Sequence, residues 1–341
     1  MKRRKFINIA LASSVISPIV VSSCRNQDAQ NRTALILTTA TTGGTFYPVG
    51  VAISTLINQK LAQTEQISMN AINSAGSGEN IQLLKNKEAD LAILQALFGS
   101  MAWQGKGRYE GKPEKELRSV TMLWENVEHF VIEKNNIRTG NIEDLNNLKG
   151  QSFSIGKRNS GTEISGRTIL SELGFDVDKD FNLEFIGYKE SSQALQNDRI
   201  SGMNTPAGIP VSAVTQAYAA MGSNNLAILE FTKEQLEKVN SNYAVWNRYT
   251  IPAQTYPGQT EEIDTIAQPN FLAVHPDIDE NVVYKITKNI YENLPFLQDI
   301  HKATLAMKLD RAIAGLPIPL HSGAVKYYQE VGLNIPSNLI S

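Results

Sequence analysis

TTGGTFYP, at residues 41–48, is the stretch of this sequence that best predicts its fold. It follows the apolar run 34–37 and precedes apolar residues at helical spacing over 48–62. This order is typical of a buried strand, a glycine loop and the N-terminus of a helix in an α/β protein. Such a junction directs free backbone N–H groups and the positive end of a helix dipole toward a ligand. The stretch therefore predicts a site for a small anion or polar solute.

A second junction of the same kind lies more than a hundred residues further along the chain. Residues 152–155 are expected to form a strand, GKRNSGTE at 156–163 a loop, and 162–173 a helix. Two such sites that faced one another would form a ligand cleft between two lobes. Two unrelated strand-to-helix turns, which are common in α/β proteins, are the alternative.

The first residues of the chain have the pattern of an export signal. Four basic residues at 2–5 precede an apolar stretch over 6–21. That stretch is shorter than the ~20 apolar residues that a membrane-spanning helix needs. The paired Arg3 and Arg4 also resemble a twin-arginine signal, so both Sec and Tat export remain open. The pattern predicts that the chain leaves the cytoplasm.

Cys24 is the single cysteine of the chain and ends the run Val-Ser-Ser-Cys, which resembles a bacterial lipobox. We expect a lipoprotein signal peptide over 1–23, lipidation of Cys24 and a polar tether over 24–33. A plain signal peptide with an incidental cysteine is the alternative. The mature protein would be a membrane-anchored lipoprotein in the periplasm or at the cell surface. It would contain no disulfide, since no second cysteine remains.

The charge balance argues against nucleic acid as a partner. Residues 1–23 hold four of the 32 Lys and Arg and none of the 34 Asp and Glu, so the mature chain would have a net charge of −6. A nucleic-acid-binding domain would instead carry a basic face. The mature chain is also long enough for more than one hydrophobic core.

Short apolar runs alternate with helical patterns along the mature chain, which is typical of an α/β protein with parallel sheet. Strands are expected over 34–38, 67–71, 91–94, 119–123, 129–133, 152–155, 183–186, 226–229 and 270–274. Helices are expected over 48–62, 78–87, 162–173, 190–199, 209–221, 232–240, 280–294, 303–313 and 322–331.

Two further segments offer polar groups to the first site. Ser77, Glu79 and Asn80 lie at the start of the second predicted helix, and Gln95 ends the third predicted strand. Ligands of open α/β sheets bind outside the carboxyl ends of the strands, which favours Gln95 as a contact. Helix capping is the alternative role for Ser77 and Glu79.

The second site has its own set of donors. Ser160, Gly161 and Thr162 are expected to cap the helix after GKRNSGTE, where hydroxyl and N–H groups would bind a carboxylate. Lys157 or Arg158 would add a positive charge, although an isolated basic residue is more often solvated.

The segment MNTPAGIP at 203–210 precedes another helical pattern. It would complete the second wall of the site with Thr205, Ala207 and Gly208. A loop interrupted by two prolines is the alternative.

The motifs of common enzyme classes are absent from the sequence. There is no GxSxG elbow, no phosphate-loop lysine motif and no HExxH, and the four histidines lack metal-ligand spacing. We interpret Glu125, Glu128 and His129 as polar residues at the edge of a strand. The sequence thus predicts no catalytic residue, no metal and no cofactor. A periplasmic enzyme on the same fold is the alternative.

Five segments, in this order, resemble the TAXI-type solute receptors of TRAP (tripartite ATP-independent periplasmic) transporters. They are TTGGTFYPVG at 41–50, SAGSGENIQLLKNKEADLAILQ at 74–95, GKRNSGTE at 156–163, IPAQTYPGQTEEIDTIAQPNFLAV at 251–274 and GLPIPLHSGAVKYYQEVGL at 315–333. The resemblance extends from about residue 33 to residue 335. It therefore covers nearly all of the mature chain.

The resemblance implies a two-lobed periplasmic-binding-protein fold, type II-like, with a ligand cleft between lobes joined by hinge segments. One lobe would comprise 34–125 and 251–341, and the other 126–250. The receptor would capture a small organic anion or amino acid, such as glutamate or 2-oxoglutarate. It would deliver this solute to a TRAP-type permease driven by an ion gradient. A membrane sensor kinase is the alternative partner.

The resemblance also implies a set of ligand contacts. The matching positions are Gly44, Thr45, Tyr47, Ser77, Glu79, Asn80, Gln95, Ser160, Gly161, Thr162, Thr205 and Ala207. For Tyr47, packing against the protein is the alternative to ligand contact. The chain departs from the commoner second-lobe loop by having Lys157-Arg158-Asn159 where prolines and glycines are frequent. The second wall and the charge of the ligand therefore stay open.

Overall fold

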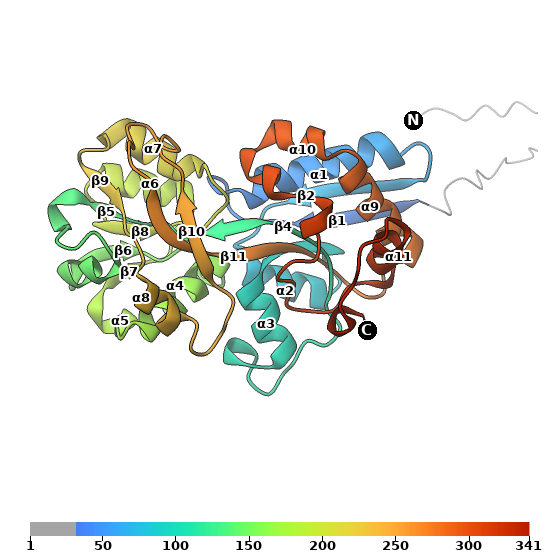
Figure 1. The fold of residues 1–341 in the computed structure, drawn as a ribbon, viewed down its shortest axis with the longest axis horizontal. Helices are drawn as coiled ribbons and strands as arrows, with labels where there is room; N and C mark the ends of the chain where they lie inside the picture. The colour runs from blue at the N-terminus through green and yellow to red at the C-terminus, as the bar shows by residue number, and fades with distance from the viewer. Residues whose placement is uncertain (1–31, 341) are drawn as a thin grey trace, which may run out of the picture. The chain divides into compact units, whose positions relative to one another are not determined.

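Two β-sheets organise the computed structural model, which describes residues 32–340 (Figure 1). The first sheet has the order β10-β11-β3-β1-β2, with β4 also paired to β11. Its strands are β1 (Thr33–Thr38), β2 (Ile67–Ile72), β3 (Leu91–Gln95), β4 (Arg118–Val127), β10 (Asn247–Ile251) and β11 (Ile263–Val274). The predicted signal peptide, Cys24 and nearly all of the predicted tether lie outside the described residues.

The second sheet has the order β7-β6-β8-β5-β9. Its strands are β5 (Phe130–Glu133), β6 (Ser152–Ser154), β7 (Asn182–Glu184), β8 (Gly202–Asn204) and β9 (Leu226–Ile228). Both sheets carry helices, so the predicted α/β class is confirmed (Figure 1).

The helices fall into two groups along the chain. Helices α1 (Phe46–Leu61), α2 (Ser77–Lys85), α3 (Ala96–Gln104), α9 (Glu280–Glu292), α10 (Leu294–Ile300) and α11 (Ser322–Glu330) belong to the chain segments of the first sheet. Helices α4 (Gly161–Glu172), α5 (Val177–Asp180), α6 (Tyr188–Gln196), α7 (Ser212–Met221) and α8 (Lys233–Val239) belong to those of the second. Of the helices in residues 32–340, none has the length and apolar character that spanning a bilayer requires.

Short 3₁₀ segments complete the described structure. They are η2 (Gly107–Tyr109), η3 (Lys134–Asn136), η4 (Ile142–Leu148), η5 (Lys302–Ala306), η6 (Leu309–Arg311) and η7 (Ser337–Leu339). The α-helix predicted over 303–313 is wrong, because η5 and η6 occupy this region. The carbonyl of Ala312 accepts hydrogen bonds from Met122 N (2.7 Å) and Thr121 Oγ1 (3.2 Å) of β4, so tertiary contacts replace helical ones.

The prediction of parallel sheet is wrong in part, because both sheets are mixed. β1 pairs in parallel with β2 and β3, whereas β11 is antiparallel to β3, β4 and β10. In the second sheet β5 is antiparallel to β8 and β9. The long strand β11 runs back along β3 and β4 in the direction opposite to both, so these pairings are antiparallel.

The chain passes between the two sheets along β4 and β11. At the end of β4, Val127 exchanges both backbone hydrogen bonds with Ala207 of the second-sheet segment, at 2.9 and 3.0 Å. At the start of β11, Thr265 Oγ1 donates to the carbonyl of Glu128, and Ile266 O accepts from its N–H. These two strands therefore hold the sheets together.

Glu128 and His129 are fully buried where β4 leads into β5, so their interpretation as strand-edge residues is wrong. His129 Nδ1 lies 2.8 Å from Val127 O, and Nε2 lies 2.7 Å from the hydroxyl of Tyr256. Asn204 Nδ2 donates to Glu128 Oε2 at 3.2 Å. Burial raises the pKa of Glu128 to about 7 and lowers the pKa of His129 to about 4.

Three groups of buried apolar side chains form the cores. The largest packs the first sheet against α1, α9 and α11, and the other two pack the second sheet against its helices. Ile251, Tyr256 and Ala267 pack in a core with Val131 and Met203 of the second sheet. These three side chains belong to the segment 251–341, which was assigned to the first lobe, but they lie beside the second sheet. The lobe boundary at residue 251 stays a prediction.

Candidate ligand-binding site

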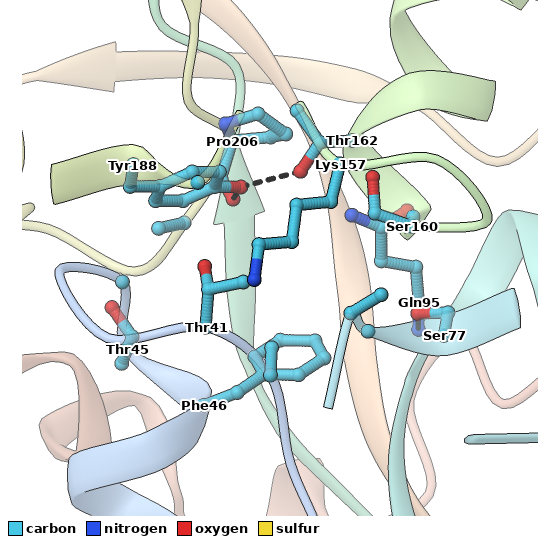
Figure 2. Close-up of a pocket in the computed structure, with 17 residues that line it drawn as sticks. Thr41, Thr45, Phe46, Ser77, Gln95, Lys157, Ser160, Thr162, Tyr188 and Pro206 are labelled. Atoms are coloured by element: carbon cyan, nitrogen blue, oxygen red, sulfur yellow. Dashed lines mark hydrogen bonds between the residues drawn. The ribbon is translucent and has the colours of Figure 1, made fainter. Parts of the chain in front are cut away.

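The N-termini of five helices in the described part of the chain meet at one pocket, whose lining residues are drawn in Figure 2. Each helix follows a strand: α1 follows β1, α2 follows β2, α3 follows β3, α4 follows β6 and α6 follows β7. The N-cap residues all line the pocket; they are Thr45, Gly76, Gln95, Ser160 and Gly187. The first N–H groups of a helix have no acceptor within it, and its N-terminus carries partial positive charge. The pocket is therefore built to attract negative charge.

The structure brings most of the predicted contact residues to this pocket. Those among its lining residues are Gly44, Thr45, Ser77, Gln95, Ser160, Gly161, Thr162 and Ala207. Those that do not line it are Tyr47, Glu79, Asn80 and Thr205. Their roles as ligand contacts are predictions, and the geometry shows what each side chain does in this structure.

Asn80 holds the loops of the first half together. Its side-chain oxygen accepts from Thr38 Oγ1 and Ser74 Oγ, and its Nδ2 donates to the carbonyls of Thr39 and Ile93. All hydrogen-bonding positions of this buried amide are therefore occupied by the protein.

Glu79 also bonds to the protein, since its Oε2 accepts from Ala75 N at 2.6 Å and so closes the turn before α2. Thr205 is fully buried and its N–H donates to His129 O at 3.0 Å, while its Oγ1 has no hydrogen-bond partner among the described residues.

Phe46 lines the pocket where the sequence predicted Tyr47. Its ring meets Trp124 edge-on at 6.0 Å, which fixes its orientation. Successive helical side chains point about 100° apart, so a neighbour of Phe46 faces another direction. Because α1 begins two residues earlier than predicted, sequence patterns could not distinguish between the two aromatic side chains.

Tyr188 is a second pocket residue that sequence reasoning missed. It is the first residue of α6, and its hydroxyl donates to Pro206 O at 2.7 Å and lies 2.7 Å from Thr162 Oγ1 (Figure 2). Burial raises the pKa of this phenol above its ordinary value, so it stays protonated. The sequence predicted that the helix begins at residue 190, which left Tyr188 in a loop.

Two serine hydroxyls remain free to donate to a ligand. Ser160 Oγ accepts from Glu163 N at 3.0 Å and caps α4, while Ser77 Oγ accepts from Gln95 N at 3.1 Å. In both cases the hydroxyl acts as acceptor, so its proton is available. By contrast, Thr45 Oγ1 donates to Gly208 O at 2.8 Å and ties the first loop to the second-sheet segment.

Gln95 carries an unsatisfied acceptor into the pocket. Its side chain is 3% exposed, and Oε1 has no hydrogen-bond partner among the described residues. A buried acceptor without a protein partner is free to accept a hydrogen bond from a ligand. Gly161 lies directly against this amide, since a Cβ at position 161 would lie 2.6 Å from its carbon.

Lys157 and Arg158 have different surroundings. The Lys157 side chain extends into the pocket (Figure 2), and its ammonium forms no ion pair with any residue in 32–340. The Arg158 guanidinium instead stacks over Phe185, 3.6 Å from the ring centre. Of the two basic residues that the sequence analysis considered, the structure places Lys157 in the pocket.

The loop before α1 and the loop before α4 close the pocket from opposite sides. The carbonyl of Gly43 accepts from Ala213 N at 3.2 Å and from Ser212 Oγ at 2.9 Å. On the other side, Glu79 N donates to Asn159 O at 3.2 Å. The cavity between the loops measures about 30 Å³. Within residues 32–340, no cluster of three His, Cys, Asp or Glu side chains is placed to bind a metal.

The profile of the NMT1-like family matches residues 37–332, which include both glycine loops and all five helix N-termini. The chain belongs to the NMT1-like family. This match does not distinguish the TAXI-type receptors, so the finer resemblance stays a prediction.

Solved structures confirm the two-lobed periplasmic-binding-protein fold of this NMT1-like protein. A protein from Bordetella bronchiseptica RB50 is similar over 90% of this chain and 86% of its own, with a TM-score of 0.53 and 14% identity. MatC from Rhodopseudomonas palustris with bound malate is similar over 88% and 96%, with a TM-score of 0.54 and 14% identity. The periplasmic binding protein BugD is similar over 89% and 94%, with a TM-score of 0.52 and 14% identity. At these identities the similarity is one of fold.

Proposed function

We propose that this NMT1-like protein is an extracytoplasmic substrate-binding protein that captures a small organic anion and delivers it to a membrane transporter. The convergence of five helix N-caps on one pocket carries this proposal. Each helix end presents N–H donors and roughly half a positive charge. Such a pocket favours a carboxylate or a similar anionic group over a neutral or cationic solute.

The chemistry of the lining residues supports binding over catalysis. Among the described residues that line the pocket there is no Asp, Glu, His or Cys. The serine hydroxyls of Ser77 and Ser160 therefore have no neighbouring base in the pocket that would activate them as nucleophiles. An anion in this pocket would be held by hydrogen bonds and released unchanged.

Closure around the anion would supply the affinity. The two halves already meet through Gly43 O and Asn159 O, and an anion between them would add contacts from both sides. A ligand stabilises the closed state only through contacts that the open state lacks. A micromolar dissociation constant corresponds to about −8 kcal/mol, which a few charge-assisted hydrogen bonds would provide.

The sequence supports the finer parts of this proposal. The signal-like residues 1–23 and the lipobox favour a lipoprotein anchored through Cys24 in the periplasm or at the cell surface. The resemblance of the five segments to TAXI-type receptors favours a TRAP-type permease as partner and glutamate or 2-oxoglutarate as the kind of solute. The two lobes would be 34–125 with 251–341 and 126–250, with β4 and β11 at the hinge.

A thermal-shift survey tests the proposed function. The purified protein is heated with a panel of small organic acids, neutral polyols and organic amines. We expect at least one organic anion to raise the melting temperature, with no turnover of that anion on incubation. Stabilisation by amines alone, or consumption of the solute, would contradict a receptor for anions.

A further inference from the structure

The carboxylates nearest the pocket do not face into it. Glu79, Glu163 and Glu190 lie in the first turns of α2, α4 and α6, and none of them lines the pocket. Glu79 and Glu163 accept from backbone N–H groups of the preceding loops. A Cβ at Gly187 would lie 2.5 Å from Glu190 Oε2 and 3.6 Å from Lys157 Cε, so Glu190 lies near Lys157 although the two form no ion pair in the described chain. Glu128 is buried and does not line the pocket either. The described residues that line the pocket therefore offer no carboxylate to an ammonium group.

Lys157 adds a full positive charge to the same pocket. It lies in the loop before α4, where its carbonyl accepts from Ser160 N at 3.1 Å. Its ammonium has no carboxylate within ion-pair distance in the described chain. A cation that faces five positive helix ends is unfavourable unless an anion lies between them.

Phe46, Pro206 and Ala207 form an apolar part of the pocket wall. These residues suit a solute with an anionic head and an uncharged body.

Gln95 supplies a partner for an uncharged polar group next to the anionic head. Its buried Oε1 would accept from a hydroxyl, and rotation of the amide would present Nε2 to an oxo group. An ammonium at this place would meet a single amide oxygen and the repulsion of Lys157. The amide therefore suits a 2-hydroxy or 2-oxo acid and disfavours the corresponding amino acid.

We propose that the solute is an organic anion without an ammonium group, a 2-hydroxy or 2-oxo carboxylate, and that Lys157 is its charge partner. This inference rests on the proposed function and narrows it. It distinguishes acids from amino acids of the same carbon skeleton, whereas the sequence analysis allowed both.

Isothermal titration of the full-length protein with matched acids tests the solute class. L-Lactate, pyruvate and L-alanine share three carbons and differ at C2, and 2-oxoglutarate and L-glutamate form a longer pair. We expect at least one of these acids to bind at least tenfold more tightly than the amino acid of the same carbon skeleton. Equal or tighter binding of alanine or glutamate than of the matching acid would overturn the exclusion of ammonium. If no acid binds, the proposed function itself fails.

Charge variants of the loop test the role of Lys157. Lys157→Met should weaken binding of the preferred acid at least tenfold, and Lys157→Arg should recover part of the loss because the charge is kept. Arg158→Met is the matched control, since it removes the neighbouring charge that stacks on Phe185, and it should leave the affinity unchanged. Unchanged affinity in Lys157→Met, with the melting temperature of the free protein also unchanged, would overturn the assignment of Lys157. An equal loss in Arg158→Met would do the same.

Discussion

Ser160 shows how one hydroxyl serves both a helix and a site. As N-cap of α4 it accepts from Glu163 N, and its proton is left for the pocket. Thr232 caps α8 in the same manner, in a complete capping box, but does not line the pocket. A comparison of the two residues therefore distinguishes what a cap contributes to stability from what a hydroxyl contributes to ligand binding.

Ser160→Ala should lower the free energy of unfolding by about 1 kcal/mol and also reduce the stabilisation that a bound anion gives. Thr232→Ala should cost a similar amount without changing the ligand-induced shift. Melting curves with and without the preferred anion measure both quantities. An equal ligand-induced shift in the two variants would show that the Ser160 hydroxyl does not contact the anion.

Glu128 and His129 are neighbours whose titrations oppose one another. Burial raises the pKa of Glu128 from 4.5 to about 7, so the folded state holds this proton more tightly than the unfolded state. The stabilisation that Glu128 gains by holding this proton is complete below about pH 4.5 and is lost as the pH rises to about 7. Burial lowers the pKa of His129 from 6.5 to about 4, so its contribution is lost as the pH falls through this range. Between about pH 4.5 and 6.5 the two effects largely cancel in the native protein.

Glu128→Gln should expose this balance, because glutamine resembles the protonated acid and does not titrate. Relative to the native protein, the variant should gain up to about 3 kcal/mol in its free energy of unfolding between pH 4.5 and pH 7.5. Urea denaturation followed by tryptophan fluorescence measures the difference at each pH. Glu262→Gln, at an exposed position, should show no such trend. A difference that is constant with pH for Glu128→Gln would contradict the assignment.

At the residue scale, the sequence predicted the cap residues well and the aromatic residues poorly. Ser160, Gly161 and Thr162 follow a recognisable strand and loop, so their place at a helix start could be inferred. Phe46 and Tyr188 depend on where a helix begins to within one or two residues, which sequence patterns do not define.

At the scale of elements, α2 and the loop before α4 form one of the contacts between the two halves, where Glu79 N donates to Asn159 O. A Cβ at Gly78 would lie 2.5 Å from the carbonyl oxygen of Asn159. This atom belongs to the backbone and cannot move aside as a flexible side chain would. Gly78 lies within α2, where alanine suits the backbone better than glycine.

Gly78→Ala should therefore hinder closure of the two halves without preventing the protein from folding. We expect the added methyl group to push the loop before α4 away from α2 while each half keeps its fold, so that affinity for the anion falls at least tenfold. Small-angle scattering with saturating anion should give a larger radius of gyration than for the native protein. Gln82→Ala, on the exposed face of the same helix, is the control and should behave as the native chain. Native-like affinity in Gly78→Ala would show that this contact is not part of the ligand-bound state.

The elements that sequence reasoning missed have a physical explanation. Helix α3 is buried on nearly all sides, so its apolar residues show no helical period. Strands β8 and β10 are short, and β10 pairs only through the long return strand β11. Local patterns do not contain such long-range pairing, whereas β1, β3 and α9 were predicted almost to the residue.

At the scale of the whole molecule, the site is defined by chemistry and not by size. A groove lined by Trp124, Tyr249 and Arg311 has a volume of about 510 Å³, far larger than the pocket between the helix N-termini. In that groove Arg311 is already paired with Glu125, at 2.9 Å. The smaller pocket combines five helix ends, Lys157 and an unsatisfied amide. The sequence predicted two facing strand–loop–helix junctions but not the convergence of five, which depends on the order of strands in each sheet.

A crystal structure with the most strongly stabilising anion tests this account most directly. We predict electron density for the anion between the N-termini of α1 and α4, within hydrogen-bond distance of the N–H groups of Gly161 and Thr162 and beside Lys157. Density in the groove at Trp124 and Tyr249 instead, or an anion bound away from all five helix N-termini, would contradict it.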